Sequence, residues 1–531
     1  MKKILSVCLT LTLLLTFFTG CGAAVSSAEE AASQSGSTAA ELPKAPQDGS
    51  VAIVLSDEQI LVDGETASTD EAAAVYAAND IVFYPSGQDF TFGEGEAEDA
   101  HEQSEADSHT VVHITKAGTY RLSGKLSAGQ VAVDLGEEAQ EDPAATVTLI
   151  LDGVDITCTV APGVIFYNVY ECGSSDAETA SKDVDTSKAG ANVIIADGSV
   201  NTVNGAYVAR IYKPGTVELS EDGTEVADAK KLHKYDAAFY SKMSMNISGG
   251  EKGDGVLNIH AKNEGLDSEL HLTVNGGKIN IVSGNDGINT NEDGVSVTTV
   301  NGGSLNILCD GSTGEGDGID SNGWLVINGG TVISAACATS GDAGIDSDMG
   351  IYLNGGTVVA SGNMMDRIGE SDATFAVFQF AQRQKGGSEY LLKNELGEQI
   401  AAWTPANDFT YLVVSGEELT PGTYSLWQGD TRLSVASGMR GGMMPGRFDM
   451  GQMPEGFDPA NMPQNGQIPE AFIPGNMPPP DRMPEGFDPE NMPQGRPEGE
   501  RGKGGFDGKL QSQSFTESFS LVQGENQFIV Q

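Results

Sequence analysis

The sequence predicts an all-β protein whose central part is a right-handed parallel β-helix, a solenoid in which each repeat forms one coil of short strands. Gly-Gly pairs recur at steps of 27, 26, 27 and 26 residues, beginning at Gly249, Gly276, Gly302, Gly329 and Gly355. A regular period of this length is typical of a solenoid. Apolar and polar residues alternate before and after most of these pairs, which is the pattern of half-buried strands. A third phrase, Gly-apolar-Asp-Ser, recurs between the strand runs and indicates a corner.

The residues before the solenoid predict export from the cytoplasm. Residues 1–20 combine a basic start with an apolar run and resemble a lipoprotein signal peptide. Cleavage would leave Cys21 as the lipid anchor, and ordinary signal cleavage is the alternative. Residues 21–50 are rich in Ala, Ser and Glu, the composition of a flexible linker. We therefore expect the protein on the extracellular side of the cell membrane, attached by lipid.

The rest of the chain divides into five segments. N-terminal strands and an acidic loop occupy 51–108, and the parallel β-helix occupies 109–370. Capping strands are expected over 371–437, since the open end of a solenoid needs a cover. A Met/Pro/Gly-rich segment over 438–510 repeats one phrase with a period of 15 residues and is predicted to be a disordered insertion. Alternation returns over 511–531 and predicts a strand that pairs with the cap.

The charge of the chain limits the classes of partner. Its net charge is −47, from 76 acidic and 29 basic residues. This balance argues against nucleic acid and against anionic lipid surfaces as partners. It suits an exported solenoid that binds calcium, although solubility alone is another reading of the same charge. We expect a monomer.

The corner phrase predicts a column of carboxylates. Asp267, Asp320 and Asp346 stand at the same corner of different repeats, nine residues before the next Gly-Gly pair. In the odd repeat Asn289 holds the phrase while Asp293 holds the spacing, so either residue can belong to the column. Coils stack about 4.8 Å apart, and carboxylates at that separation can share a calcium ion. The alternative is that these residues only hydrogen-bond the local backbone, as turn residues often do.

A second short column is expected directly before the corner glycine, where two further aspartates stand in different repeats. The full set of candidate calcium ligands is Asp267, Asp286, Asn289, Asp293, Asp317, Asp320 and Asp346.

Candidates for sugar binding and catalysis are few. Trp324 follows a corner, where a flat ring can stack on a sugar, and a partly buried strand-edge tryptophan is an equal reading. The sequence contains no nucleophile elbow, zinc-protease motif or phosphate loop. A lyase acting on uronates would need a base beside calcium, and Lys242 and Lys262 are the candidates. The balance favours a protein without catalytic activity.

Four cysteines lie beyond the lipid site. Cys158 and Cys172 flank an apolar stretch and can form a disulfide in an oxidising compartment. Cys309 and Cys337 lie on neighbouring coils but are offset by one residue in register, which favours buried free thiols.

Several phrases together resemble a known family. They are Ile114-Thr115-Lys116-Ala117-Gly118-Thr119-Tyr120, Leu149-Ile150-Leu151-Asp152-Gly153-Val154-Asp155-Ile156-Thr157, Ala237-Ala238-Phe239-Tyr240-Ser241-Lys242 and the Gly-Ile-Asp-Ser corners. The run from about 109 to 362 is similar to the secreted carbohydrate-binding β-helix domains of anaerobic Firmicutes. The resemblance implies a pectate-lyase-like fold, bound calcium, and binding of cellulose and acidic polysaccharides without established catalysis. It carries no individual ligand residue across.

These observations lead to a primary functional hypothesis and two alternatives. We expect calcium-dependent binding of a polysaccharide partner, such as pectin, polygalacturonate or cellulose, at the bacterial cell surface. The first alternative is a polysaccharide lyase acting on uronates. The second is a structural or adhesion protein whose calcium only stiffens the solenoid.

Overall fold

The computed structural model describes residues 48–438 and 514–531, all within one compact unit, Lys44–Gln531. The described residues are almost entirely strands and turns, and most strand pairs in the repeats are parallel. The predicted all-β class is therefore confirmed. The predicted signal peptide, the lipid site Cys21 and the Met/Pro/Gly-rich segment 438–510 lie outside the described residues, except for residue 438. Among the described residues, no helix has the length and apolar character needed to cross a membrane.

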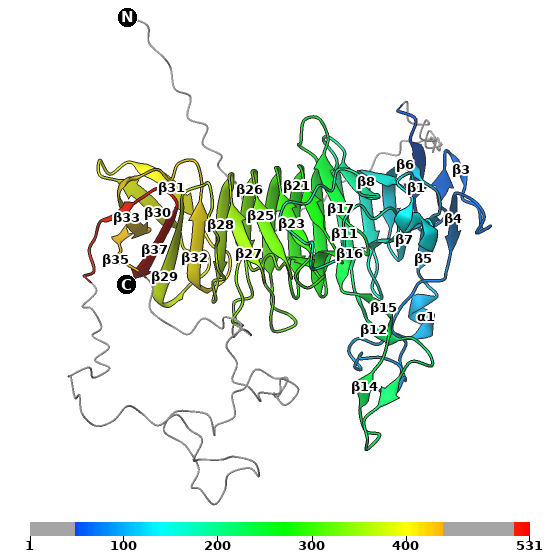
Figure 1. The fold of residues 1–531 in the computed structure, drawn as a ribbon. Helices are drawn as coiled ribbons and strands as arrows, with labels where there is room; N and C mark the ends of the chain where they lie inside the picture. The colour runs from blue at the N-terminus through cyan, green and yellow to red at the C-terminus, as the bar shows by residue number, and fades with distance from the viewer. Residues whose placement is uncertain (1–47, 439–513) are drawn as a thin grey trace, which may run out of the picture. The chain divides into compact units, whose positions relative to one another are not determined.

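Three rows of parallel strands make up the repeats, and Figure 1 shows their strands following one another from β6 to β28. The first row consists of β1 (Val51–Leu55), β6 (Gly118–Leu126), β8 (Val147–Thr157), β10 (Ala191–Ile195), β17 (Met245–Gly249), β20 (Leu272–Val274), β23 (Val297–Val300), β25 (Trp324–Ile327) and β27 (Gly350–Leu353). The second row continues from β8 through β11 (Val200–Gly205), β18 (Val256–Ala261), β21 (Lys278–Ser283), β24 (Ser304–Cys309), β26 (Thr331–Ala335) and β28 (Thr357–Gly362).

The third row carries the corner acids. It consists of β5 (Thr110–Ile114), β7 (Gly129–Asp134), β9 (Val164–Asn168), β16 (Ala237–Ser241), β19 (Glu264–Ser268) and β22 (Ile288–Thr290), with β4 (Val75–Ala78) antiparallel at one edge. Short elements complete the N-terminal part: β2 (Leu61–Val62), β3 (Glu65–Thr66), the helix α1 (Gln103–Ala106) and a 3-10 turn at Glu137–Glu141.

The core of the repeats is a set of aliphatic stacks. Val274, Val300, Ile327 and Leu353 occupy one register position on successive strands, and each is fully buried. Burying such a side chain contributes roughly 1.5–3 kcal/mol. Because the same position is apolar in every repeat, the hydrophobic effect aligns the repeats with one another.

The Gly-Gly period has a direct steric cause. In four of the five pairs the second glycine has a positive φ, as at Gly303, where φ is +84°. A Cβ on Gly303 would lie 2.6 Å from the carbonyl oxygen of Gly277 in the preceding repeat. Only glycine satisfies both demands, because other residues rarely adopt this conformation.

An asparagine precedes four of the five Gly-Gly pairs, and these side chains form a ladder. The Nδ2 groups of Asn301, Asn328 and Asn354 each donate to the Oδ1 of the asparagine one repeat earlier, at 2.9 Å. The ladder begins at Asn275. It connects side chains only when the repeats are in register, so it supports the same alignment as the core.

An excursion between β11 and β16 brings two lysines to the third row. Its strands are β12 (Val208–Tyr212), β13 (Glu218–Leu219), β14 (Val226–Asp228) and β15 (Lys231–Tyr235). β12 pairs with β15, and β13 pairs with β14, both antiparallel. β15 ends one residue before Asp236, which directly precedes β16.

A separate apolar cluster follows the last repeat. Its strands are β29 (Phe375–Gln384), β30 (Tyr390–Asn394), β31 (Gln399–Trp403), β32 (Phe409–Ser415), β33 (Gly422–Gln428), β34 (Thr431–Arg432), β35 (Val435–Ser437), β36 (Phe519–Leu521) and β37 (Glu525–Val530). β32 pairs antiparallel with β28 and so covers the edge of the last repeat. β37, from the end of the chain, pairs with β29 and β35.

Candidate functional site

The strand register places most of the corner residues in one column. Asp267 pairs with Asn289, and the bridge between Ile288 and Ile319 brings Asp320 next in line. The backbone N–H of Asp346 donates to the carbonyl of Ile319 at 2.7 Å, which continues the same alignment. Asn289 therefore takes the position that the sequence left open. Asp293 lies in the turn after β22, where its Oδ1 accepts a hydrogen bond from Asn322 Nδ2 at 2.9 Å.

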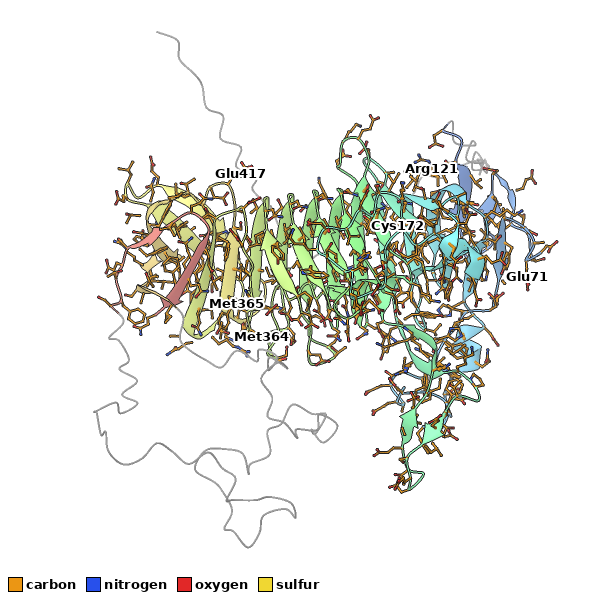
Figure 2. All side chains as sticks on the ribbon, in the orientation of Figure 1. Glu71, Arg121, Cys172, Met364, Met365 and Glu417 are labelled. Carbon is orange, nitrogen blue, oxygen red and sulfur yellow. The ribbon has the colours of Figure 1, made fainter. Side chains whose placement is uncertain are left out.

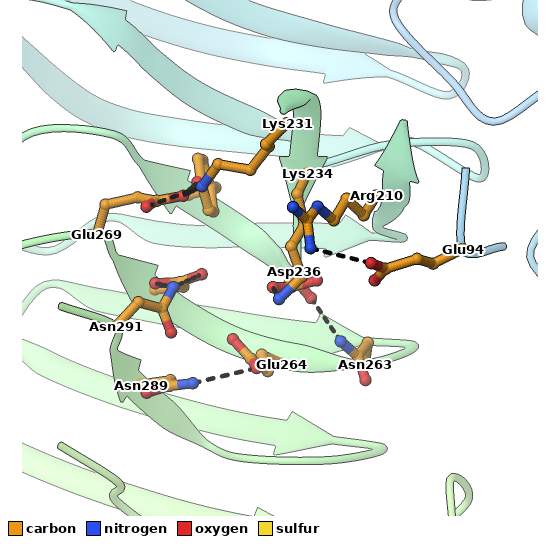
Figure 3. A network of polar contacts seen from close by, with 12 residues as sticks. Glu94, Arg210, Lys231, Lys234, Asp236, Asn263, Glu264, Glu269, Asn289 and Asn291 are labelled. Carbon is orange, nitrogen blue, oxygen red and sulfur yellow. Dashed lines mark hydrogen bonds and ion pairs between the residues drawn. The ribbon is translucent and has the colours of Figure 1, made fainter. Parts of the chain in front are cut away.

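The strongest candidate for a metal site is an acidic triad formed by Asp236, Glu264 and Asp267. One carboxylate oxygen from each lies within 4.8 Å of the other two. Glu264 opens β19 and Asp267 lies three residues later, while Asp236 comes from the neighbouring repeat just before β16. The relative exposures of the three residues are 9%, 6% and 0%. Figure 3 shows how Asp236 and Glu264 lie toward one another across the two strands.

Amides supply part of the hydrogen bonding around the triad. Asn291 Nδ2 lies 2.9 and 3.0 Å from the two carboxylate oxygens of Asp267. Asn289 Nδ2 donates to Glu264 Oε1 at 3.2 Å. The second oxygen of Glu264, Oε2, and the Oδ1 of Asn289 are buried and have no hydrogen-bond partner. Because an unpartnered buried oxygen is costly, these two atoms could serve as ligands of a metal ion.

Burial also disfavours the charged form of all three carboxyl groups. Burial, followed by the charges of Asp267 and Asp236, raises the pKa of Glu264 well above its ordinary value. Burial and the charge of Asp236 do the same for Asp267, and burial raises the pKa of Asp236. Two of the three carboxylates have no ion pair among the described residues. Calcium prefers oxygen ligands of this kind, so the donor set fits a hard divalent cation.

Two lysines from β15 border the triad. Lys234 Nζ lies 2.6 Å from Asp236 Oδ2, and Lys231 Nζ lies 2.8 Å from Glu269 Oε1. Glu269 also accepts a hydrogen bond from the hydroxyl of Tyr240, which pairs in register with Asp267. The excursion is therefore attached to the acidic corner through both lysines (Figure 3).

An open groove lies over this corner. The residues that line it are Lys231, Lys234, Asp236, Glu269, Asn291, Glu292, Asp293 and Asn322. Carboxylates, amides and ammonium groups are the side chains that hydrogen-bond sugar hydroxyls and acid groups, and here they meet beside the triad.

The second column of aspartates is also present. Asp286 Oδ1 accepts the backbone N–H of Asp317 at 2.7 Å, and Asp317 Oδ1 accepts the backbone N–H of Ala343 at 2.5 Å. Burial, opposed by these hydrogen bonds, raises the pKa of Asp286 to about 7 and that of Asp317 to about 9. These hydrogen bonds join successive repeats, 31 and 26 residues apart, and do not involve the local backbone of the turn.

The remaining corner acids form a further, partly buried group. Burial and neighbouring carboxylates raise the pKa values of Asp320 and Asp346 to about 7. Asp366, which follows β28, contributes to the effect on Asp346, and its own pKa is raised by burial. Asp346 Oδ1 is buried without a hydrogen-bond partner.

Trp324 lies apart from the triad in the strand order. It opens β25 in the first row, in register with Val297 and Gly350, and is partly exposed. His271 occupies the same register position two repeats earlier, where burial lowers its pKa to about 4.

The two lysines proposed as lyase bases do not make the closest ionic contacts to the acids. Lys242 follows β16, but the ion pair of Glu269 at that level is with Lys231. Lys262 precedes β19, and its charge acts on Glu105. Among the described ion pairs, the lysines beside the triad are Lys231 and Lys234.

The cysteines outside residues 1–47 are free thiols. Cys158 and Cys172 do not form a disulfide, and Cys172 lies in the loop after β9 (Figure 2). Cys309 and Cys337 are buried free thiols, as predicted.

Sequence reasoning missed four residues of this site. Asp236 stands outside the Gly-apolar-Asp-Ser phrase, so the repeat gave no signal for it. Glu264 directly precedes the corner glycine, as Asp286 and Asp317 precede theirs, so the repeat did mark its position, although it was not singled out. Lys231 and Lys234 belong to the excursion, which has no repeat partner. One signal was available: Lys234 and Asp236 are two residues apart, directly before a strand, and residues at that spacing share one face of extended chain.

Fold and site together define a β-rich repeat protein with an acidic, polar groove. The chain belongs to the family of carbohydrate-binding domain-containing proteins, which matches residues 108–180 and 183–375, half of the chain. A carbohydrate-binding domain-containing protein of Acetivibrio thermocellus is 28% identical over 175 residues, 33% of this chain and 46% of the relative. The chain thus spans about half the length of that relative. A solved structure of the polysaccharide lyase-like protein from C. thermocellum, a gadolinium derivative, aligns with a TM-score of 0.34 and 19% identity over 61% of this chain and 93% of that chain.

Proposed function

We propose that this protein binds acidic polysaccharide, such as polygalacturonate, through calcium held at the acidic triad. The observation that carries the proposal is the set of three buried carboxylates within 4.8 Å of one another, one of them with an unpartnered oxygen. Calcium coordinates six to eight oxygens, so a triad leaves positions for a carboxylate and hydroxyls of the glycan. Membership of a carbohydrate-binding family supports polysaccharide as the ligand class.

This proposal requires calcium because the groove is acidic and the glycan is also negatively charged. The groove beside the triad carries Glu292 and Asp293 in addition to the ion-paired Asp236 and Glu269. A polyanionic glycan would be repelled by these groups. A divalent cation between the two sets of carboxylates removes the repulsion and supplies a direct bond.

We further infer that the three rows of strands form a right-handed parallel β-helix of the pectate-lyase-like type. The parallel register between successive repeats and the Gly-Gly period support this inference. We also propose that lipid on Cys21 holds the protein at the outer side of the cell membrane, on the evidence of the signal sequence.

Retention on a polygalacturonate affinity gel tests the proposal. Electrophoresis is run in calcium and in chelator, with a neutral glucan gel as the control for non-specific retention. We expect retardation in the polygalacturonate gel with calcium and free migration with chelator. Equal retardation in both conditions would exclude the calcium bridge, and no retardation on any gel of a glycan panel would favour a structural role.

A lyase acting on uronates is the second candidate function. The observation that favours it is the presence of two lysines beside the acidic triad. Lys231 and Lys234 lie where a base would have to stand next to a metal-bound carboxylate. Both are ion-paired, and the pKa of Lys234 is raised by Asp236 against the effect of burial. A raised pKa disfavours the neutral amine that a base requires, so binding without catalysis is the better supported function. The ultraviolet absorbance of an unsaturated product would reveal lyase activity.

A further inference from the structure

Lys234 forms an ion pair with Asp236, one of the three carboxylates that a metal ion would need. Its ammonium group contacts Asp236 Oδ2 at 2.6 Å, whereas Glu264 and Asp267 have no ammonium partner among the described residues. The three carboxylates of the triad therefore share a single contacting ammonium group, and two of them have no cation in contact among the described residues.

We propose that Lys234 is a tethered counter-ion of the triad, and that a divalent cation entering the triad displaces it from Asp236. The inference rests on the proposed function, because it takes the triad as the calcium site. An ion at about 2.3–2.6 Å from each carboxylate would bind the carboxylate of Asp236 that already contacts the ammonium group. Calcium and the Lys234 ammonium group would repel each other at this carboxylate. Because the ammonium group is carried on a flexible stem, it is the cation that would move away.

The surroundings of Lys234 allow this movement. Its side chain is 44% exposed and lines the open groove, while the side chain of Asp236 is only 12% exposed. The strand that carries Lys234 is held independently, by pairing of β15 with β12 and by the contact of Lys231 with Glu269. Displacement thus requires rotation of one side chain and no change in the backbone.

The displacement would couple the cation to the glycan. A freed ammonium group would lie in the groove next to Asn291 and Asn322, where it can contact a sugar carboxylate. One calcium ion would then add two positive charges at the triad and turn the positive charge of Lys234 toward the ligand. An acidic glycan would meet this positive groove only when calcium is bound.

Lysine-selective acylation of the unmodified protein, read by mass spectrometry, tests the displacement. Lys231 is a matched internal control, since its side chain is 42% exposed and also ion-paired. We expect saturating calcium to raise the labelling rate of Lys234 by about threefold or more and to leave Lys231 nearly unchanged, because only Lys234 loses its carboxylate partner. Calcium binding is followed in parallel by calorimetry.

Calcium affinity of two variants gives an independent readout. Lys234→Met keeps the apolar stem and removes the competitor, and we expect its calcium Kd to fall by about tenfold, or ~1.4 kcal/mol. Lys231→Met removes an equal charge without freeing Asp236 and should change the Kd much less. Calcium heat with unchanged Lys234 labelling would overturn the displacement while leaving the calcium site intact. No calcium heat in the parent protein would overturn the proposed function and this inference together.

Discussion

At the scale of single residues, the acidic triad shows how burial makes an ordinary carboxylate a candidate cation ligand. Glu264 is 6% exposed and one of its oxygens has no partner, so the protein without a cation keeps a cost that a metal would remove. Asp320 and Asp346 show a weaker form of the same effect, with pKa values raised to about 7 by burial and by neighbouring acids. For the triad and for the pair Asp320 and Asp346 we therefore expect calcium to raise the Tm, an effect that exposed acids would not give.

The first prediction concerns the pair Asp320 and Asp346, which stand at one register position on consecutive repeats. If calcium bridges them, replacing both by asparagine removes a site whose binding contributes about 2.7 kcal/mol at a calcium concentration of 100 times Kd. We expect Asp320→Asn with Asp346→Asn to show a smaller calcium-induced rise in Tm than the parent. Scanning calorimetry with and without calcium measures it.

The control for that pair is Glu251→Gln with Glu395→Gln, which removes two exposed acids elsewhere on the surface. It should respond to calcium as the parent does. If the Asp320 and Asp346 variant is more stable without calcium and keeps the full calcium response, these acids are turn residues under mutual repulsion.

At the scale of elements, the repeat period could be predicted from sequence because its causes are local. A Gly-Gly pair and an aliphatic position every 26 or 27 residues are visible in the chain itself. The acids that meet at the triad could not be predicted in the same way. Asp236 and Glu264 come together only because β16 and β19 pair in parallel, a contact between residues 28 apart that carry no shared phrase. The lysines of β15 depend on the path of an excursion that no repeat constrains.

The second prediction tests the steric role of the Gly-Gly turns. Gly303→Ala should lower the Tm more than Gly198→Ala, although both glycines have a positive φ. A Cβ at Gly198 meets open space, whereas one at Gly303 meets backbone atoms at 2.6 and 2.9 Å. The strain from φ is about 1–2 kcal/mol in both, and overpacking adds about 1–3 kcal/mol at Gly303 alone. Equal Tm losses would contradict the close approach of the repeats.

At the scale of the whole molecule, the large negative charge bears on the proposed binding of a cation. The chain carries a net charge of −47, and acids gather at buried and partly buried corners beside its third row. Compact states with large net charge are destabilised by self-repulsion. The proposed divalent cation would therefore stabilise this arrangement, in addition to its proposed role in binding glycan.

The third prediction is a pH dependence with a definite sign. The pKa values of Asp286, Asp320 and Asp346 are raised to about 7, and that of Asp317 to about 9, from an ordinary value of 3.8. At pH values between the ordinary pKa and the raised pKa of each group, the folded protein binds more protons than the unfolded chain. The free energy of unfolding therefore falls as the pH rises through this range. In chelator we expect a lower Tm at about pH 8 than at about pH 5.

Saturating calcium should reduce this difference, because a bound cation replaces the protons on the buried acids. Sodium chloride at the same ionic strength is the control, since it screens surface charge without entering the sites. A Tm that rises from pH 5 to pH 8 in chelator would show that the buried acids are ionised and compensated without a divalent cation, a sign opposite to the one expected here.

The most direct test of the central claim is the calcium dependence of polygalacturonate retention in Glu264→Gln. This change keeps the size of the side chain and removes one charge from the triad, and Glu251→Gln is the matched exposed control. We predict that Glu264→Gln loses calcium-dependent retention, or needs about tenfold more calcium to reach it, while Glu251→Gln migrates like the parent. A Glu264→Gln variant that folds normally and is retained at the parent's calcium concentration would show that glycan binding does not depend on a cation at the acidic triad.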